Sequence, residues 1–472
     1  MANKTNKLFL VFTAVVFLSF LVFFTAVSFY RFNIMQVFFY DFGIFARIIW
    51  KLSRFQPPYI NHFTLGRVFF LGDHFNPSLV LLVPFFWLTS NLRIILFEQA
   101  LATVSSGIMI FLIAKKLKLT KITCLLMAIV FLFFAGTENP LVTDWHPEPT
   151  AGFFLLLFFY FFSFTDFKIG YLLSALIFLG FKESNAVSFI FLLVWLFFLK
   201  SEKRREIIAL GIFSIVWFFT TTKVFIPFFS HRPYLYTPQI PSSTAEIIKN
   251  FFNPPVKRRL ILNSLLSFGF IPLASIIGML PIIGELAIRL IPTVSLFQSY
   301  TLAMHYNVYL GIYLALATIY GLINIKKIFR NKKTAEYILA LCLFLSSVFT
   351  ARKITSSPVN LAINPVFWKE LLNRNESLQV INSIPKKGTV MSQNNILPHL
   401  VVRDEEIYFL KKDYKNYKPQ FIIFDLTPNQ NINNIWETNP KLLVRLKEKL
   451  LQDKSYRRIQ TSNEYLYIFY KN

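Results

Sequence analysis

Residues 8–30 read LFLVFTAVVFLSFLVFFTAVSFY, and residues 39–45 shortly after them read FYDFGIF. The first stretch carries no charge and is long enough to cross a bilayer, since a helical span needs about 20 apolar residues. A signal peptide has a shorter apolar core of roughly 7–15 residues, and no small-residue cleavage site follows here. We therefore expect an uncleaved first span, followed directly by a carboxylate, Asp41, among aromatic side chains that suit a membrane interface.

The rest of the chain repeats this apolar pattern. Of its 472 residues, 55% are hydrophobic and 18% aromatic, and long apolar runs recur up to about residue 350. This composition predicts an all-α polytopic membrane domain over residues 1–350, with about 11 spans. The run 75–90 is open to two interpretations, a full crossing or a re-entrant or interfacial segment.

The formal net charge is +25, and much of it lies in short connections such as residues 115–121 and 326–333. Basic connections mark the cytoplasmic side, so we expect an integral plasma-membrane protein with a cytoplasmic N-terminus. The remaining charge suits anionic lipid headgroups or a phosphorylated lipid substrate. No basic helix or RNA-binding motif accompanies the charge, so we expect no nucleic-acid partner.

The composition changes near residue 351. Apolar runs shorten to strand length at 389–391, 407–410, 421–424 and 465–470, and helical patterns cover 365–383 and 439–451. These patterns predict a small soluble α/β domain over residues 351–472, on the extracytoplasmic side. The oligomeric state is not indicated by any pattern in the chain.

Asp41 has two interpretations. A carboxylate in a shallow pocket beside the membrane suits a general base or a ligand for a divalent metal. The same residue suits the N-cap of an interfacial helix over residues 41–52, where apolar side chains recur at helical spacing.

Residues 144–148 alternate three potential ligands, Asp144, His146 and Glu148. Two prolines, Pro147 and Pro149, favour an extended backbone, and alternate side chains of an extended segment face the same way. Two carboxylates and an imidazole suit a divalent metal or an acid/base site for phosphate chemistry. The alternative is a solvated loop in which the glutamate caps a helix.

Two further clusters carry ionisable groups. Asp73-His74 offers a ligand, a proton shuttle or simply polar residues at the membrane surface. Lys182-Glu183 lies between two short apolar runs, where an ionisable pair is costly and more often has a function than none. The ammonium group of Lys182 is suited to contact a phosphate. The alternative for this dipeptide is a self-neutralised pair at an exposed turn. Weaker candidates on the same side are His305, Arg232, Arg67 and Lys223, although snorkelling to the headgroups explains Lys223 without any function.

Together these motifs resemble the family of predicted membrane proteins known as domain of unknown function 2079. The stretches that carry the resemblance are residues 40–45, 72–77, 144–148 and 182–184, His305-Tyr306, and, in the soluble part, Leu397-Pro398-His399-Leu400 with Arg403 and Ile407-Tyr408. Ala46, Arg47 and Ser184 depart from the residues expected at their places.

That family in turn resembles the GT-C superfamily of membrane glycosyltransferases, which use polyprenyl-phosphate-linked sugars. The resemblance implies that Asp41 is the general base or a metal-site carboxylate, and that Lys182, Arg232 and His305 contact the donor phosphate. With Asp144 and Glu148 from the alternating stretch, Asp41 completes the set of expected catalytic residues. It also allows a divalent metal, magnesium or manganese, at some of Asp41, His74, Asp144, His146 and Glu148. Asp73, His74, His146, Glu183 and Tyr306 are further site candidates. A transporter or lipid flippase, and a non-catalytic scaffold, are the alternative functions.

Overall fold

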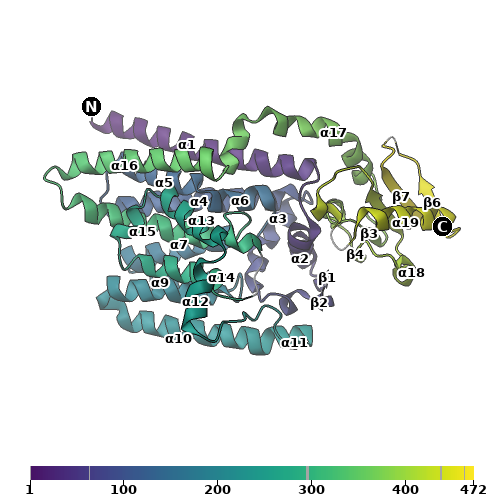
Figure 1. The fold of residues 1–472 in the computed structure, drawn as a ribbon, viewed down its shortest axis with the longest axis horizontal. Helices are drawn as coiled ribbons and strands as arrows, with labels where there is room; N and C mark the ends of the chain where they lie inside the picture. The colour runs from purple at the N-terminus through teal and green to yellow at the C-terminus, as the bar shows by residue number, and fades with distance from the viewer. Residues whose placement is uncertain (1, 63, 294–296, 436–437, 462) are drawn as a thin grey trace.

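The computed structural model describes residues 2–62, 64–293, 297–435, 438–461 and 463–472. A bundle of helices occupies the first part of the chain, and a small sheet with its own helices forms the C-terminal part at one end of that bundle (Figure 1). The sheet is where the sequence predicts the second domain.

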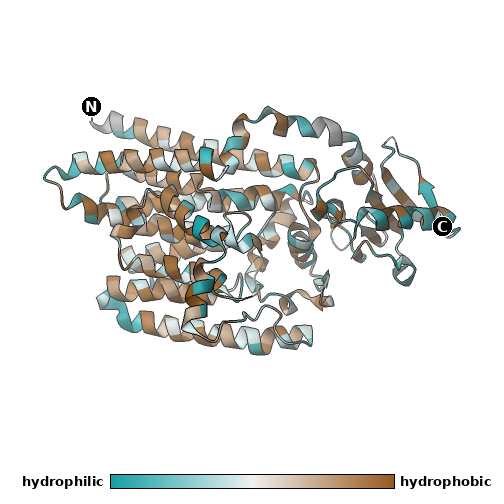
Figure 2. Cartoon of the chain, in the orientation of Figure 1, coloured by the Kyte–Doolittle hydropathy of each residue, from teal (hydrophilic) through white to brown (hydrophobic). Residues whose placement is uncertain are grey.

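Five helices among the described residues are long and apolar enough to cross a membrane. They cover Asn6–Asn33 in α1 (Ala2–Asn33), α4 (Arg93–Lys116), Ser201–Ser230, α15 (Val308–Lys326) and Lys332–Ile354. A sixth span results if α5 (Lys121–Phe133) and α6 (Ala135–Thr143), bent by 46° at their junction, are counted as one. The apolar character of these helices runs along the whole bundle (Figure 2). The expected total of 11 spans stays a prediction.

The span Ser201–Ser230 joins α10 (Arg204–Thr220), a π-helical turn and α11 (Ile226–Ser230), and the last span joins α16 (Lys332–Phe349) to a second π-helical turn. Shorter helices complete the bundle: α7 (Glu148–Phe164), α8 (Lys168–Leu179), α9 (Asn185–Leu199), α12 (Thr244–Phe252), α13 (Pro255–Ser267) and α14 (Met279–Leu290).

Helix α4 is central to the bundle. In its apolar window 72% of the residues are buried, against 17% in α1, so α4 packs among other helices while α1 presents most of its apolar surface outward. Most of α4 therefore lies inside the protein, where a polar side chain is tolerated only if it has hydrogen-bond partners.

The segment after α1 forms a platform at the end of the bundle beside the C-terminal sheet (Figure 1). It contains a π-helical turn η1 (Phe39–Gly43), helix α2 (Ile44–Ser53) and the hairpin of β1 (Tyr59–His62) and β2 (Gly66–Phe69). The helix predicted over residues 41–52 is confirmed as α2, whereas the hairpin was not predicted.

The ambiguous run 75–90 contains η3 (Pro77–Leu82) and α3 (Val83–Leu88). A 3-10 turn followed by one short α-helix rises only about 20 Å, less than the roughly 30 Å hydrocarbon core of a bilayer. Its length favours the re-entrant or interfacial interpretation.

The C-terminal sheet has the strand order β4-β3-β5-β7-β6. Its strands are β3 (Val390–Ser392), β4 (Ile407–Phe409), β5 (Phe421–Asp425), β6 (Tyr456–Ile459) and β7 (Leu466–Lys471), and its main helices are α17 (Pro365–Asn382) and α19 (Pro440–Gln452). The four predicted strands and both predicted helices are confirmed. Strand β6 was missed because it is an edge strand with three exposed residues, so it lacks an apolar run.

Arg47 fastens the C-terminal part to the platform. Its side chain is 2% exposed and donates to the backbone carbonyls of Val401, Arg403 and Glu405. A guanidinium presents several donors in a fixed plane, so one side chain satisfies three carbonyls of a turn. Arg47, one of the three residues that depart from the expected family pattern, therefore holds the C-terminal part against the platform in this chain.

Candidate active site

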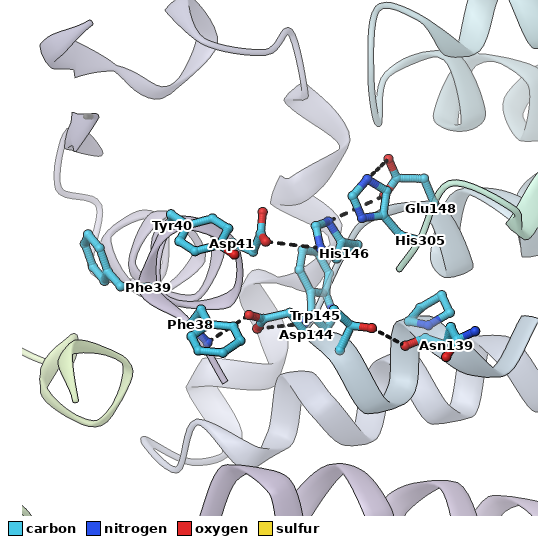
Figure 3. Close-up of polar contacts among 12 residues, drawn as sticks. Phe38, Phe39, Tyr40, Asp41, Asn139, Asp144, Trp145, His146, Glu148 and His305 are labelled. Atoms are coloured by element: carbon cyan, nitrogen blue, oxygen red, sulfur yellow. Dashed lines mark hydrogen bonds and ion pairs between the residues drawn. The ribbon is translucent and has the colours of Figure 1, made fainter. Parts of the chain in front are cut away.

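Asp41 lies in the π-helical turn η1, which is held from two sides. The backbone N–H of Phe38 donates to Asp144 Oδ2 at 2.8 Å, and the N–H groups of Phe39 and Tyr40 donate to Asn394 Oδ1 from the C-terminal part. The N-cap of α2 is Gly43, without a side-chain hydrogen bond. The alternative interpretation of Asp41 as that N-cap is therefore wrong, and its carboxylate is free to face the site (Figure 3).

The stretch 144–148 is anchored by two polar residues of α4. Gln99 donates to the carbonyls of Pro140 and Asp144 and accepts from the N–H of His146 at 2.8 Å. Glu98 accepts from Trp145 Nε1 and from Thr150 Oγ1. Sequence reasoning missed both residues, although two adjacent polar residues in an apolar span were a usable signal.

Asp144 does not face the same way as its two neighbours. Its Oδ2 accepts from Phe38 and its Oδ1 from the N–H of Trp145. The expectation of a common direction is thus wrong for Asp144, because α6 ends and α7 begins on either side of the stretch and the backbone turns between them. Its observed contacts are those of a residue that holds the Asp41 turn (Figure 3).

Glu148 is the centre of a compact charged group. Its Oε1 lies 2.9 Å from Lys182 Nζ and 3.7 Å from His305 Nε2, and its Oε2 lies 3.9 Å from His146 Nδ1. On its other side His146 Nε2 lies 3.7 Å from Asp41 Oδ2. The rings of His146 and His305 stack with centroids 3.5 Å apart. Residues far apart in sequence thus meet at one point (Figure 3).

A second group adjoins the first through Lys182-Glu183. Glu183 pairs with His74 Nδ1 at 2.9 Å and accepts from Tyr234 at 2.7 Å, while Tyr236 donates to Asp73 and stacks on His74. Each member of the Lys182-Glu183 dipeptide has its own partner elsewhere, so the alternative of a self-neutralised pair at an exposed turn is wrong.

Burial and neighbouring charges set the protonation of these groups. Burial, reinforced by Glu148, raises the pKa of Asp41 to about 7. Burial lowers the pKa of His305 to about 4 and that of His146 well below its usual value. For Lys182 the pull of Glu148 and Glu183 outweighs burial and raises the pKa, so the lysine stays charged.

The structure brings together most of the predicted residues. Asp41, His146, Glu148, Lys182 and His305 form one group, and Asp73, His74 and Glu183 form the adjoining one. Tyr306 lies against the ring of His305. Arg232 is exposed and its guanidinium donates to the carbonyl of Thr64, outside both groups.

Three side chains of the first group have the geometry of a metal site. Ligand atoms of His146, Glu148 and His305 lie within 4.8 Å of one another, and all three residues are buried. The atoms His146 Nε2, Glu148 Oε2 and His305 Nδ1 have no hydrogen-bond partner. The three side chains converge, and two imidazoles with one carboxylate are a ligand set that fits a bound cation. Asp41, His74 and Asp144 do not belong to this triad.

The sequence from residue 31 to residue 467 matches the family described as predicted membrane protein, DUF2079. The chain belongs to this family. It is therefore an integral membrane protein, as the apolar helices indicate. None of the curated proteins matches the sequence.

Two solved structures are similar over nearly the whole chain. ArnT from Cupriavidus metallidurans bound to undecaprenyl phosphate matches with a TM-score of 0.58 at 10% identity, covering 97% of each chain. The apo state of the same protein matches with a TM-score of 0.51 at 11% identity, covering 95% of this chain and 97% of that one. At such identities the likeness shows a shared fold alone.

Proposed function

We propose that this protein is a membrane glycosyltransferase that moves a sugar from a polyprenyl-phosphate-linked donor to an acceptor hydroxyl. The observation that carries the proposal is the convergence of Asp41, Glu148 and Lys182, with two histidines, at one end of the bundle. The structural likeness to ArnT, crystallised with undecaprenyl phosphate, supports the choice of donor.

The proposed reaction is one displacement at the anomeric carbon. The Asp41 carboxylate accepts the proton of the acceptor hydroxyl, the hydroxyl oxygen forms a bond to the anomeric carbon, and the bond from that carbon to the phosphate oxygen breaks. The polyprenyl phosphate leaves with the bonding electron pair, and the charged Lys182 stabilises its developing negative charge. A single displacement of this kind inverts the anomeric configuration.

The side chains of His146, Glu148 and His305 would hold a divalent cation. Two imidazoles with one carboxylate favour zinc or manganese over magnesium, which prefers oxygen ligands. A bound cation would add positive charge for a phosphate. Lys182 donates to Glu148 Oε1, so the lysine and the cation would share one carboxylate.

Transfer of a labelled sugar from a polyprenyl-phosphate donor in reconstituted vesicles tests the proposal. Asp41→Asn is expected to lower the rate by at least about a hundredfold, since general-base catalysis contributes roughly 10²–10⁴-fold. Asp166→Asn, which changes an exposed aspartate at a turn, is the matched control. Unchanged transfer in Asp41→Asn overturns the assignment, and substrate flux without a covalent product would favour a transporter instead.

We propose further that the chain divides at residues 350 and 351, that the site and the C-terminal domain lie on the extracytoplasmic side, and that the N-terminus is cytoplasmic. The basic α15–α16 connection and the N-terminus lie at the end of the bundle away from the sheet (Figure 1), as the positive-inside bias requires. In a Cys342→Ser background, Lys454→Cys should react with an impermeant thiol reagent in intact cells, and Lys333→Cys should not. Both lysines are exposed, and the reverse pattern overturns the orientation.

A further inference from the structure

Two residues singled out in the sequence, His399 and Arg403, take no part in the candidate active site. They line a cavity of about 160 Å³ where the end of α1 and the start of α4 meet the C-terminal part. Phe32, Leu92 and Arg403 are buried in its floor, whereas Lys386 is exposed at its rim. The cavity is therefore open to a ligand from outside and closed beneath.

The cavity is cationic. Arg93, Lys386 and Arg403 line it, and its lining contains no carboxylate. Arg93 donates to the amide oxygens of Asn33 and Asn91, and Arg403 donates to the backbone carbonyls of Leu400 and Gly388. These neutral acceptors orient the guanidinium groups, and Glu405, whose charge favours the charged form of Arg403, does not line the cavity.

His399 adds an unsatisfied polar group. Both of its ring nitrogens are buried without a hydrogen-bond partner, and its ring packs on Phe32 with centroids 4.3 Å apart. An imidazole always carries at least one N–H donor, and leaving a buried donor unpaired costs free energy. A ligand with acceptor oxygens would satisfy it.

We propose that this cavity binds a phosphate group. Three cations and an imidazole donor around one space suit a compact anion with several acceptor oxygens, and guanidinium groups match phosphate geometry. Burial and the charge of Arg93 lower the pKa of His399 to about 3, so this ring offers an N–H while remaining neutral.

A membrane lipid is the first source of such a phosphate, and free phosphate is the second. Helix α1 ends at the cavity and helix α4 begins there, and both are long enough to span a membrane. This placement puts the cavity at the depth of the lipid headgroups. Trp87 and Leu88 come just before the cavity-lining residue Ser90 in the sequence, and their side chains are 60% and 80% exposed. Such an apolar surface accommodates the acyl chains of a lipid whose phosphate occupies the cavity.

The test uses the purified full-length protein in a non-ionic detergent, with binding followed by the shift in melting temperature. The probes are short-chain phosphatidic acid, short-chain phosphatidylcholine and inorganic phosphate. The proposal requires saturable stabilisation by phosphatidic acid or by inorganic phosphate. Phosphatidic acid alone identifies a lipid source, whereas equal stabilisation by inorganic phosphate identifies a free anion. Stabilisation by neither overturns the proposal.

Two neighbouring lysines give a matched pair of variants. Lys386 lines the cavity and Lys387 does not, and both are exposed. Lys386→Glu is expected to weaken binding by about tenfold, the effect of losing one charge-assisted contact, while Lys387→Glu stays within about twofold. Equal weakening by both variants would mean diffuse electrostatic attraction and overturns the site.

His399→Phe provides an independent variant. It removes both ring nitrogens and keeps an aromatic ring against Phe32, so the fold is retained. We expect at least about tenfold weaker binding of the phosphate probe. Binding equal to the wild type in His399→Phe overturns the role of this residue and with it the proposed site.

Discussion

Lys182 and Glu148 form an ion pair of 2.9 Å that joins the turn between α8 and α9 to the start of α7. The carboxylate is 8% exposed and the ammonium 22%, so both charges are largely removed from water. Lys182 does not depend on its sequence neighbour Glu183, because the carboxylate of Glu183 is bound to His74 and Tyr234. The pair therefore ties two helical segments together and sets the charge at the centre of the site.

A double-mutant cycle on this pair tests the relationship. Lys182→Met alone leaves a buried carboxylate without its cation and is expected to cost about 3–5 kcal/mol of unfolding free energy. Adding Glu148→Gln removes the orphaned charge, so the double variant should be more stable than the sum of the single effects predicts, by at least about 1 kcal/mol. Unfolding in detergent provides the measurement, and strictly additive effects contradict the pair.

The metal triad predicts a measurable metal content. Purified wild-type protein should contain about one transition-metal ion per chain by mass spectrometry, and His305→Ala should lose it because only two of the three ligands remain. A chelator should lower the melting temperature of the wild type and leave that of His305→Ala unchanged, since ligand removal acts only on a protein that binds it.

The control for this experiment is His399→Phe, which removes a histidine far along the chain from the triad and should keep the metal. A wild-type protein free of metal after growth and purification with added zinc or manganese contradicts the triad. Equal metal content in wild type and His305→Ala contradicts it as well.

Arg47 predicts how the C-terminal part is attached. Arg47→Met removes three donors and leaves the carbonyls of Val401, Arg403 and Glu405 unpaired, each worth about 1.5–3 kcal/mol when bonded to a charged donor. We expect rapid proteolytic release of the C-terminal part. Lys51→Met, which loses one exposed bond to the Asp404 carbonyl, should cleave at nearly the wild-type rate.

The sequence predicted the elements of this protein better than the contacts between them. Apolar run length was enough to predict the strands β3, β4, β5 and β7, because a strand buried on both faces needs a continuous apolar run.

Contacts between distant elements had no such signal. Alternation along residues 144–148 could not reveal that Asp144 turns back to Phe38, because its direction depends on where α6 ends. Asn394 holds the Asp41 turn although it lies 355 positions after Phe39 in the sequence. Among the residues that make these contacts, Glu98 and Gln99 could have been recognised in the sequence, because they are polar residues within an apolar span.

His399 predicts a specific loss of stability in acid. Its pKa is about 3 in the folded protein and 6.5 ordinarily, so the unfolded chain takes up a proton first as the pH falls. The stabilisation from keeping the ring neutral is complete above pH 6.5 and is lost progressively toward pH 3. At pH 5 the loss is about 2 kcal/mol, because each pKa unit corresponds to about 1.4 kcal/mol.

The other charged groups that line the cavity with His399 are Arg93, Lys386 and Arg403, and the lining contains no carboxylate. Comparing the unfolding free energy of wild type and His399→Phe between pH 7 and pH 4, in phosphate-free detergent, isolates the histidine. The wild-type curve should fall more steeply than that of the variant. Parallel curves would show that the ring is already solvated in the folded protein. Added phosphate, if it occupies the cavity, should reduce the difference because an adjacent anion raises the pKa of the ring.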